Sequence, residues 1–159
     1  PTLAVIKGAA FGGGVGLISC CDIALASENS IFSLSEVKVG LIPATISPYV
    51  INAIGARNAR RLFTSGERFD SNIAKQINLV HEIAKEEDLE KRISYFINHF
   101  KQNGPQAVIA AKKIVLDIFN KEIDDSVISH TCEVISALRT SKEGREGVTA
   151  FLEKRDPKW

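Results

Sequence analysis

The run Gly8-Ala9-Ala10-Phe11-Gly12-Gly13-Gly14-Val15-Gly16-Leu17 follows directly on a short β-favouring segment, Thr2–Lys7. The pattern of Thr2–Lys7 predicts a buried strand, and that of Val15–Asp22 predicts a helix rich in small residues. A glycine-rich connection from strand to helix leaves backbone N–H groups exposed at the helix N-terminus, where the helix dipole favours negative charge. The run therefore indicates either a site for a developing anion or tight packing of the helix on the strand.

Two common phosphate-binding motifs do not fit this run. A dinucleotide fingerprint needs glycines at positions i, i+2 and i+5, and starting from Gly12 the third position is Leu17. A Walker A loop needs Gly-Lys-Ser/Thr after its spacer, whereas Gly14 and Val15 follow Gly13. A developing oxyanion remains a candidate ligand for the backbone N–H groups of this run.

Outward from the glycines, the chain changes from strands to helices. We expect further strands at Ile23–Ser27 and Ile31–Ser33, an extended segment at Leu79–Ile83, and a helix that Ser47 caps and Gly55 stops. Hydrophobic periodicity and turn residues predict the remaining helices at residues 58–65, 71–77, 87–102, 105–120, 124–138 and 142–153. The pattern predicts one α/β unit with helices following it.

Composition places the chain among ordinary globular proteins. The formal net charge is +1, so no global field attracts nucleic acid or anionic lipid, and no apolar stretch reaches the length of a membrane span. The three cysteines include the adjacent pair Cys20 and Cys21, with no Cys-x-x-Cys and no histidine pair at ligand spacing. We expect a reducing compartment, no metal site, and buried thiols that pack as small hydrophobic side chains.

A longer pattern in a fixed order joins these features across essentially all 159 residues. Its segments are Gly8–Leu17, Cys21-Asp22-Ile23-Ala24-Leu25-Ala26, Phe32-Ser33-Leu34-Ser35-Glu36-Val37-Lys38-Val39-Gly40-Leu41-Ile42-Pro43, Ala56–Arg61, Thr64–Phe69 and Gly147–Arg155. This order closely resembles the crotonase (enoyl-CoA hydratase/isomerase) superfamily. Within it, Ala44–Val50 resembles bacterial 3-methylglutaconyl-CoA and γ-carboxygeranoyl-CoA hydratases, because most crotonases have a glycine-rich run there.

The resemblance implies an acyl-CoA thioester substrate, with coenzyme A arriving as part of the substrate and no metal or other cofactor. Members of the family polarise the thioester carbonyl between two backbone N–H groups, because preorganised donors stabilise the enolate oxygen that forms. The resemblance assigns one donor to Gly13 and the other to an N-terminal segment outside this chain. It assigns transfer of the α-carbon proton to Glu36, which from the residues alone reads as a solvated edge carboxylate.

One position departs from the family pattern. Family hydratases typically carry a second glutamate shortly after the glycines, and this chain has Gly16 there. Three alternatives follow: Glu36 does both proton transfers through water, a residue such as Ser47 or Tyr49 orients the water, or the enzyme is an isomerase that moves a single proton.

Other candidate residues have simpler explanations. Phe151 and Lys154, one helical turn apart, match a family region that contacts the CoA adenine and its 3′-phosphate, although Lys154 also reads as a solvated lysine. We expect Asp22 to be a structural hydrogen-bond acceptor. We expect the scattered histidines and basic side chains to be solvent-exposed or hydrogen-bonded within the fold, and not to form a nucleic-acid site. These residues are His81, His99, His130, Arg57, Arg60, Arg61, Lys112 and Lys113.

The combined expectation is an α/β fold: the C-terminal part of a crotonase (ClpP/crotonase-like) spiral core with following helices at residues 1–103, then a helical trimerisation region at 104–159. The expected activity is that of a cytoplasmic enoyl-CoA hydratase, a lyase of fatty acid or branched-chain amino acid catabolism acting on a branched substrate like 3-methylglutaconyl-CoA. The expected assembly is a homotrimer or dimer of trimers. The alternatives are an enoyl-CoA isomerase that uses Glu36, and a non-catalytic acyl-CoA-binding or oligomerisation module.

Overall fold

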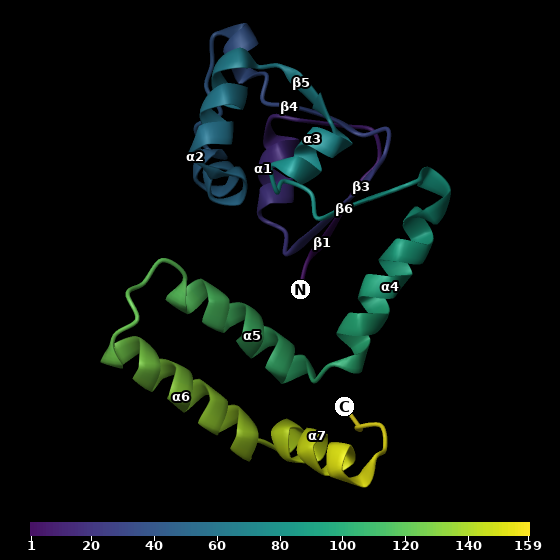
Figure 1. Ribbon diagram of the computed structural model, residues 1–159, viewed down its shortest axis with the longest axis vertical. Helices are drawn as coiled ribbons and strands as arrows, with labels where there is room; N and C mark the ends of the chain where they lie inside the picture. Colours follow the sequence, from purple (N-terminus) through teal and green to yellow (C-terminus); the bar gives the residue numbers. More distant parts are fainter. The chain divides into compact units, whose positions relative to one another are not determined.

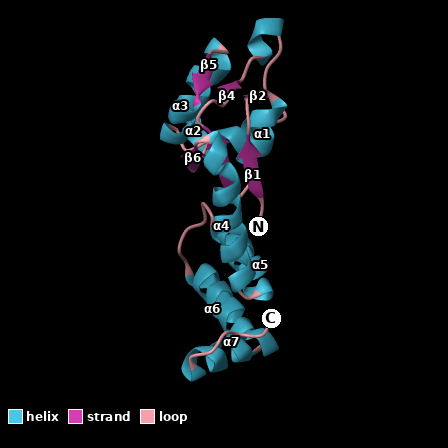
Figure 2. Ribbon diagram, turned by 90° about the vertical axis from the view of Figure 1, so that its right-hand side faces the viewer, coloured by secondary structure: helices cyan, strands magenta, loops and turns pink.

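A computed structural model describes residues 1–159, which form two compact units. Thr2–Ser94 form the first, called here the α/β unit, and Tyr95–Trp159 with Pro1 form the second, called the helical unit. The boundary falls inside helix α4 (Leu89–Gln102). All strands belong to the α/β unit, whereas the helical unit consists of helices and loops (Figures 1 and 2).

The strands form two sheets of three. The first sheet is entirely parallel, in the order β1 (Leu3–Ile6), β3 (Ile23–Ser27), β6 (Glu82–Ala84). The second has the order β2 (Ala9–Phe11), β4 (Ile31–Ser33), β5 (Arg68–Asp70), in which β2 and β4 are parallel and β5 is antiparallel to β4. The predictions for β1, β3 and β4 are confirmed. Strands β2 and β5 were not predicted, because Ala9–Phe11 lies among glycines and Arg68–Asp70 follows the turn at Gly66, so neither stands out as a β-favouring run.

Glycines set the start of helix α1 and interrupt helix α2. Helix α1 (Gly13–Ser19) begins two residues before the predicted start, because Gly12, with φ 49° and ψ −115°, ends the preceding extended segment. Helix α2 (Ser47–Ser65) contains a non-helical Gly55, with φ 76° and ψ 154°. The predicted stop at Gly55 is therefore confirmed as a break between two helical segments.

The predicted cap at Ser47 is wrong, whereas the helix predicted to open at Ser71 does begin there. Ile46 occupies the N-cap of α2, and the Ser47 hydroxyl donates to the Ala44 carbonyl at 2.8 Å. Helix α3 (Ser71–Gln76) is capped by Asp70, whose carboxylate accepts the Ile73 N–H at 2.9 Å. Ser71 is instead fully buried, and its hydroxyl donates to the Ser27 carbonyl at 2.7 Å, which ties α3 to the end of β3.

The helical unit contains α5 (Pro105–Ile118), α6 (Asp125–Thr140) and α7 (Lys142–Glu153), all close to their predicted ranges. Helix α5 packs against α6 and α7, and α6 packs against α7. The Glu143 carboxylate of α7 accepts the N–H groups of Gln106 and Ala107 at 3.0 and 2.8 Å, so it satisfies donors of the first turn of α5.

The core of the α/β unit surrounds Phe32 and Phe69, which are paired across β4 and β5 with ring centroids 5.5 Å apart. Aliphatic residues from α1, α2 and α3 complete it. The prediction that the cysteines are buried is wrong: Cys20 and Cys132 are exposed and Cys21 is half-buried, and all three are free thiols. Cys20 directly follows the last residue of α1, where the chain turns outward.

Candidate active site

The site begins where strand β2 passes into α1. The Gly12 N–H donates to the Ser33 carbonyl at 2.9 Å, which joins the glycine segment to β4. Gly12 has a backbone conformation that L side chains rarely adopt, and a Cβ added there would lie 3.0 Å from Oε1 of Glu36. Glycine is therefore required at residue 12 by its dihedral angles and by the approach of the Glu36 carboxylate.

Glu36 opens a short 3₁₀ helix, η1 (Glu36–Val39). Its backbone carbonyl accepts the Leu41 N–H at 3.0 Å, and Gly40 ends η1 in the left-handed conformation with φ 74°. These contacts fold the chain back on itself and direct the side chain toward Gly12. The predicted catalytic carboxylate and the glycine segment are thus brought together from positions 24 residues apart in sequence.

The Glu36 carboxylate has an unusual environment. Its Oε2 atom is buried and has no hydrogen-bond partner. A buried, unpaired carboxylate oxygen is costly, because the group gives up its hydration without replacement. Exceptions of this kind in a native structure point to a functional role. Glu36 is therefore not the solvated edge residue that its sequence context alone predicts.

Gly13 is the first residue of α1, and its N–H has no acceptor within the chain. A Cβ added at Gly13 would meet nothing within 4 Å, so this backbone segment faces open space. The segment has the properties that a backbone donor to a ligand oxygen needs. Packing therefore explains the glycines at 12 and 16, whereas residue 13 remains accessible.

Ile46 closes the face of α1 at Gly16. A Cβ added at Gly16 would lie 2.6 Å from Cβ of Ile46 and still closer to its Cγ2, and Gly16 is fully buried. The space beside Gly16 is therefore filled by an isoleucine side chain from the N-cap of α2. The two residues are 30 positions apart, so no local sequence pattern indicated this contact.

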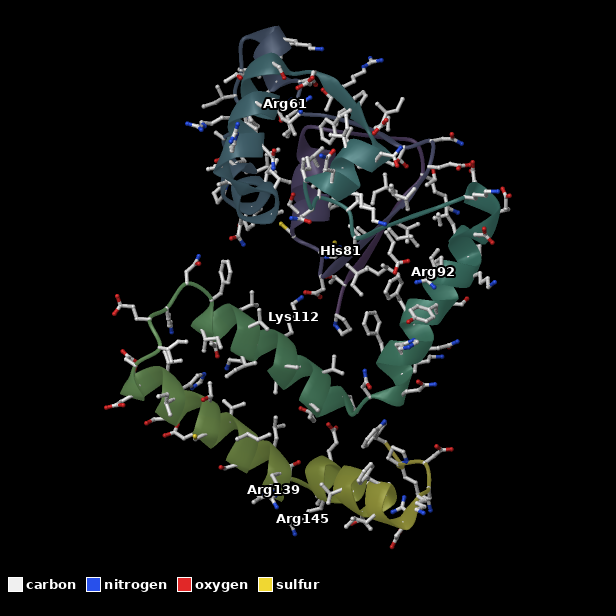
Figure 3. All side chains as sticks on the ribbon, viewed as in Figure 1. Arg61, His81, Arg92, Lys112, Arg139 and Arg145 are labelled. Atoms are coloured by element: carbon white, nitrogen blue, oxygen red, sulfur yellow. The ribbon has the colours of Figure 1, made fainter.

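The residues expected to be structural are confirmed as such. The Asp22 carboxylate accepts the Thr2 N–H at 2.7 Å and the Thr2 hydroxyl at 2.9 Å, which joins the starts of β1 and β3. Nδ1 of His81 accepts the Ala24 N–H at 3.0 Å, so this histidine extends the backbone pairing of β3 (Figure 3). Arg61 pairs with Glu67 at 2.7 Å on the surface, and this bond lowers the pKa of the Glu67 carboxyl.

The predicted CoA-binding residues belong to the helical unit. Phe151 lies on α7 and is 81% exposed, and Lys154 is the residue that ends α7, in the left-handed conformation with φ 53°. Lys154 is therefore not one helical turn along α7 from Phe151, as the spacing predicted, but directly past the helix end. Glu36 and Gly13 belong to the α/β unit.

The same architecture recurs in proteins of known sequence and structure. The sequence profile described as enoyl-CoA hydratase/isomerase matches residues 1–159. The chain belongs to the enoyl-CoA hydratase/isomerase family. A crystal structure of an enoyl-CoA hydratase from Shewanella pealeana has a TM-score of 0.94 and 46% identity, covering 100% of this chain and 59% of that one. This match confirms the expected α/β crotonase-like fold with its helical C-terminal region.

Curated relatives within the enoyl-CoA hydratase/isomerase family carry two kinds of name. Enoyl-CoA hydratase ACTT6 of Alternaria alternata is 33% identical over 152 residues, which are 94% of this chain and 50% of that protein. The mitochondrial Delta(3,5)-Delta(2,4)-dienoyl-CoA isomerase of Dictyostelium discoideum is 33% identical over 159 residues, 99% of this chain and 54% of that protein. The chain thus spans about half the length of these two relatives and matches a hydratase and an isomerase equally well.

Proposed function

We propose that this family member is an enoyl-CoA hydratase in which Glu36 carries the proton chemistry. The observation that supports this best is the buried, unpartnered Oε2 of Glu36 beside the glycine segment that begins α1. A carboxylate held close to backbone N–H groups that lack acceptors has the parts needed to form an enolate: a base for a proton and a donor for the developing oxyanion.

In the forward reaction, the substrate thioester oxygen accepts a hydrogen bond from the Gly13 N–H. Glu36 takes a proton from a water molecule as the water oxygen bonds to the β-carbon, and the electron pair of the double bond moves toward the thioester oxygen. The protonated Glu36 then delivers that proton to the α-carbon, so the net change is addition of one water. Loss of one oxyanion donor typically costs roughly 3–4 kcal/mol of transition-state stabilisation. The second donor comes, in this proposal, from polypeptide outside residues 1–159.

An enoyl-CoA isomerase is the second candidate, and the packing of Ile46 over Gly16 favours it. With no carboxylate at residue 16, Glu36 is the one acidic side chain known to lie against this part of α1. A single carboxylate suffices to remove a proton from the carbon next to the thioester and return it two carbons further along, which shifts the double bond. We place the hydratase first because the run Ala44–Val50 resembles hydratases of the family.

The substrate we propose is a branched, carboxylated enoyl-CoA such as 3-methylglutaconyl-CoA. This extends the sequence resemblance at Ala44–Val50, where Ile46, Ser47 and Tyr49 lie at the start of α2. Tyr49 is 54% exposed, and its hydroxyl is a candidate for orienting the water or the distal carboxylate. Lys154 and Phe151 are proposed to contact the 3′-phosphate and adenine of CoA.

A homotrimer or a dimer of trimers is proposed for the whole protein. The helices of the helical unit carry large apolar side chains that are at least half exposed, among them Ile109, Leu116, Ile135, Phe151 and Leu152. Apolar surface of this extent is typical of protein–protein contacts. Three free thiols agree with a reducing, cytoplasmic location. None of the helices has the length and apolar composition needed to cross a membrane.

The deciding experiment follows enoyl-thioester absorbance in the full-length protein with 3-methylglutaconyl-CoA and crotonyl-CoA, and identifies the products by mass. A gain of one water that is lost in Glu36→Gln supports the hydratase. A shifted double bond in a β,γ-unsaturated substrate, without added water, supports the isomerase instead. Thioester binding without turnover, unchanged in Glu36→Gln, would show a binding or assembly module.

A further inference from the structure

The two residues that lie against the glycine face of α1 come from different segments and have opposite chemistry. Glu36 of η1 lies over Gly12, and Ile46 at the N-cap of α2 lies over Gly16. The Gly16 N–H donates to the Gly12 carbonyl at 3.2 Å, so the two glycines are one helical turn apart. One turn is roughly 5.4 Å along the axis, so Glu36 and Ile46 approach glycines that are one turn apart at the start of α1.

We propose that Ile46 is a specificity-determining residue that keeps this site to a single carboxylate. Its side chain fills the volume that any side chain at residue 16 needs, so Gly16 and Ile46 act as a coupled pair. Since a methyl group already collides with Ile46, a glutamate at residue 16 cannot enter unless residue 46 becomes smaller. The catalytic consequence rests on the proposed function, whereas the packing of the pair does not.

The packing is tested by a thermal double-mutant cycle in the full-length protein. Alanine normally favours a helix interior over glycine, so Gly16→Ala lowers the thermal midpoint only if the added methyl collides. We expect a fall of roughly 5 °C or more in Gly16→Ala, and no further fall when the same change is made in Ile46→Gly, which removes both the Cβ and the Cγ2 that the added methyl would meet. An equal fall in both backgrounds would overturn the coupling.

Gly14→Ala is the matched control in the same helix. A Cβ at Gly14 would lie 3.7 Å from Cβ of Ala10, which is an ordinary contact. We expect its midpoint to equal or exceed that of the wild type. A fall as large as that of Gly16→Ala would mean that α1 rejects alanine in general, and the role of Ile46 would be lost.

The catalytic consequence is tested by placing a carboxylate at residue 16. In the Ile46→Gly background, Gly16→Glu is compared with Gly16→Gln, which has the same shape without the charge. We expect Gly16→Glu to hydrate crotonyl-CoA at least ~10-fold faster than Gly16→Gln, because a second carboxylate then adjoins Glu36. Equal rates would overturn the proposed specificity role. If the wild type adds water to no enoyl-CoA, the proposed function fails, and the thermal cycle still decides the packing.

Discussion

The carboxylate of Glu36 lies directly against the α-carbon of Gly12, so closely that a methyl group at residue 12 would come within 3.0 Å of Oε1. The other carboxylate oxygen, Oε2, is buried without a hydrogen-bond partner. Glu36 is half-buried, and an unpaired buried oxygen of this kind is typical of a carboxylate kept for its chemistry and not for the fold. The first prediction follows from this contact.

Glu36→Gln is expected to lower turnover by about 10²–10⁴-fold, the range of a lost general acid or base, without lowering stability. The variant keeps the shape of the side chain and removes a carboxylate whose Oε2 bonds to nothing. Enoyl-thioester kinetics and a thermal melt of the same preparation measure both effects. Glu28→Gln, an exposed glutamate of the same unit, is the control and should match the wild type in both. A large fall in the melting temperature of Glu36→Gln would contradict this separation.

Gly13→Pro and Gly13→Ala separate the backbone donor from the helix that carries it. Proline is favoured at the first residue of a helix, and the Gly13 N–H has no acceptor within the chain, so we expect α1 to form in both variants. Only proline removes the N–H. Turnover should therefore fall by about 10²–10³-fold in Gly13→Pro and stay near that of the wild type in Gly13→Ala. Equal activity in the two variants, with both folded by circular dichroism, would exclude Gly13 as the donor.

Glu146→Gln is expected to change the acid stability of the helical unit. Arg155 donates two hydrogen bonds to Glu146, at 2.6 and 3.0 Å, and the Lys158 N–H donates a third at 2.8 Å. The Arg155 bonds chiefly lower the pKa of the Glu146 carboxyl from its ordinary 4.5 to about 2. A lowered pKa in the folded state stabilises above the unfolded pKa, and this stabilisation is lost as the pH falls from 4.5 to about 2.

Thermal melts between pH 7 and pH 2 measure this effect. The difference in melting temperature between the wild type and Glu146→Gln should be largest near neutral pH, shrink below pH 4.5, and weaken with added salt because the pair is near solvent. Glu133→Gln, an exposed glutamate on α6, is the control. A difference that does not change with pH would show that the titration of Glu146 contributes nothing.

Glu143→Ala is expected to destabilise the helical unit by about 1 kcal/mol, the usual cost of losing a helix cap. Its carboxylate accepts two backbone N–H groups at the start of α5, and Gly104 leaves room for it, since a Cβ there would come 2.5 Å from Oε1 of Glu143. Denaturant unfolding followed by circular dichroism measures the change. Glu133→Ala should cost far less, and equal losses in the two variants would contradict the capping role.

Local sequence patterns were sufficient for most elements of the fold. The β-favouring runs at Thr2–Lys7 and Ile23–Ser27 gave β1 and β3, and the break at Gly55 appears where a glycine interrupts a helical pattern. Strands β2 and β5 were not predicted because each lies beside glycines in the sequence and is defined by its pairing with β4. The cap of α2 was placed one residue too late, at Ser47 and not at Ile46, because the serine hydroxyl offered a plausible capping group.

The sequence by itself determined the family, the order of strands and helices, and the identity of the one glutamate in the matching motif, because these depend on residue types at fixed spacings along the chain. Only the tertiary structure decided what lies over each glycine of α1. Gly12 receives Glu36 from 24 residues away and Gly16 receives Ile46 from 30 residues away. Such contacts depend on how η1 and α2 pack against α1, and a one-dimensional pattern contains no information about which side chain fills a space that a glycine leaves open.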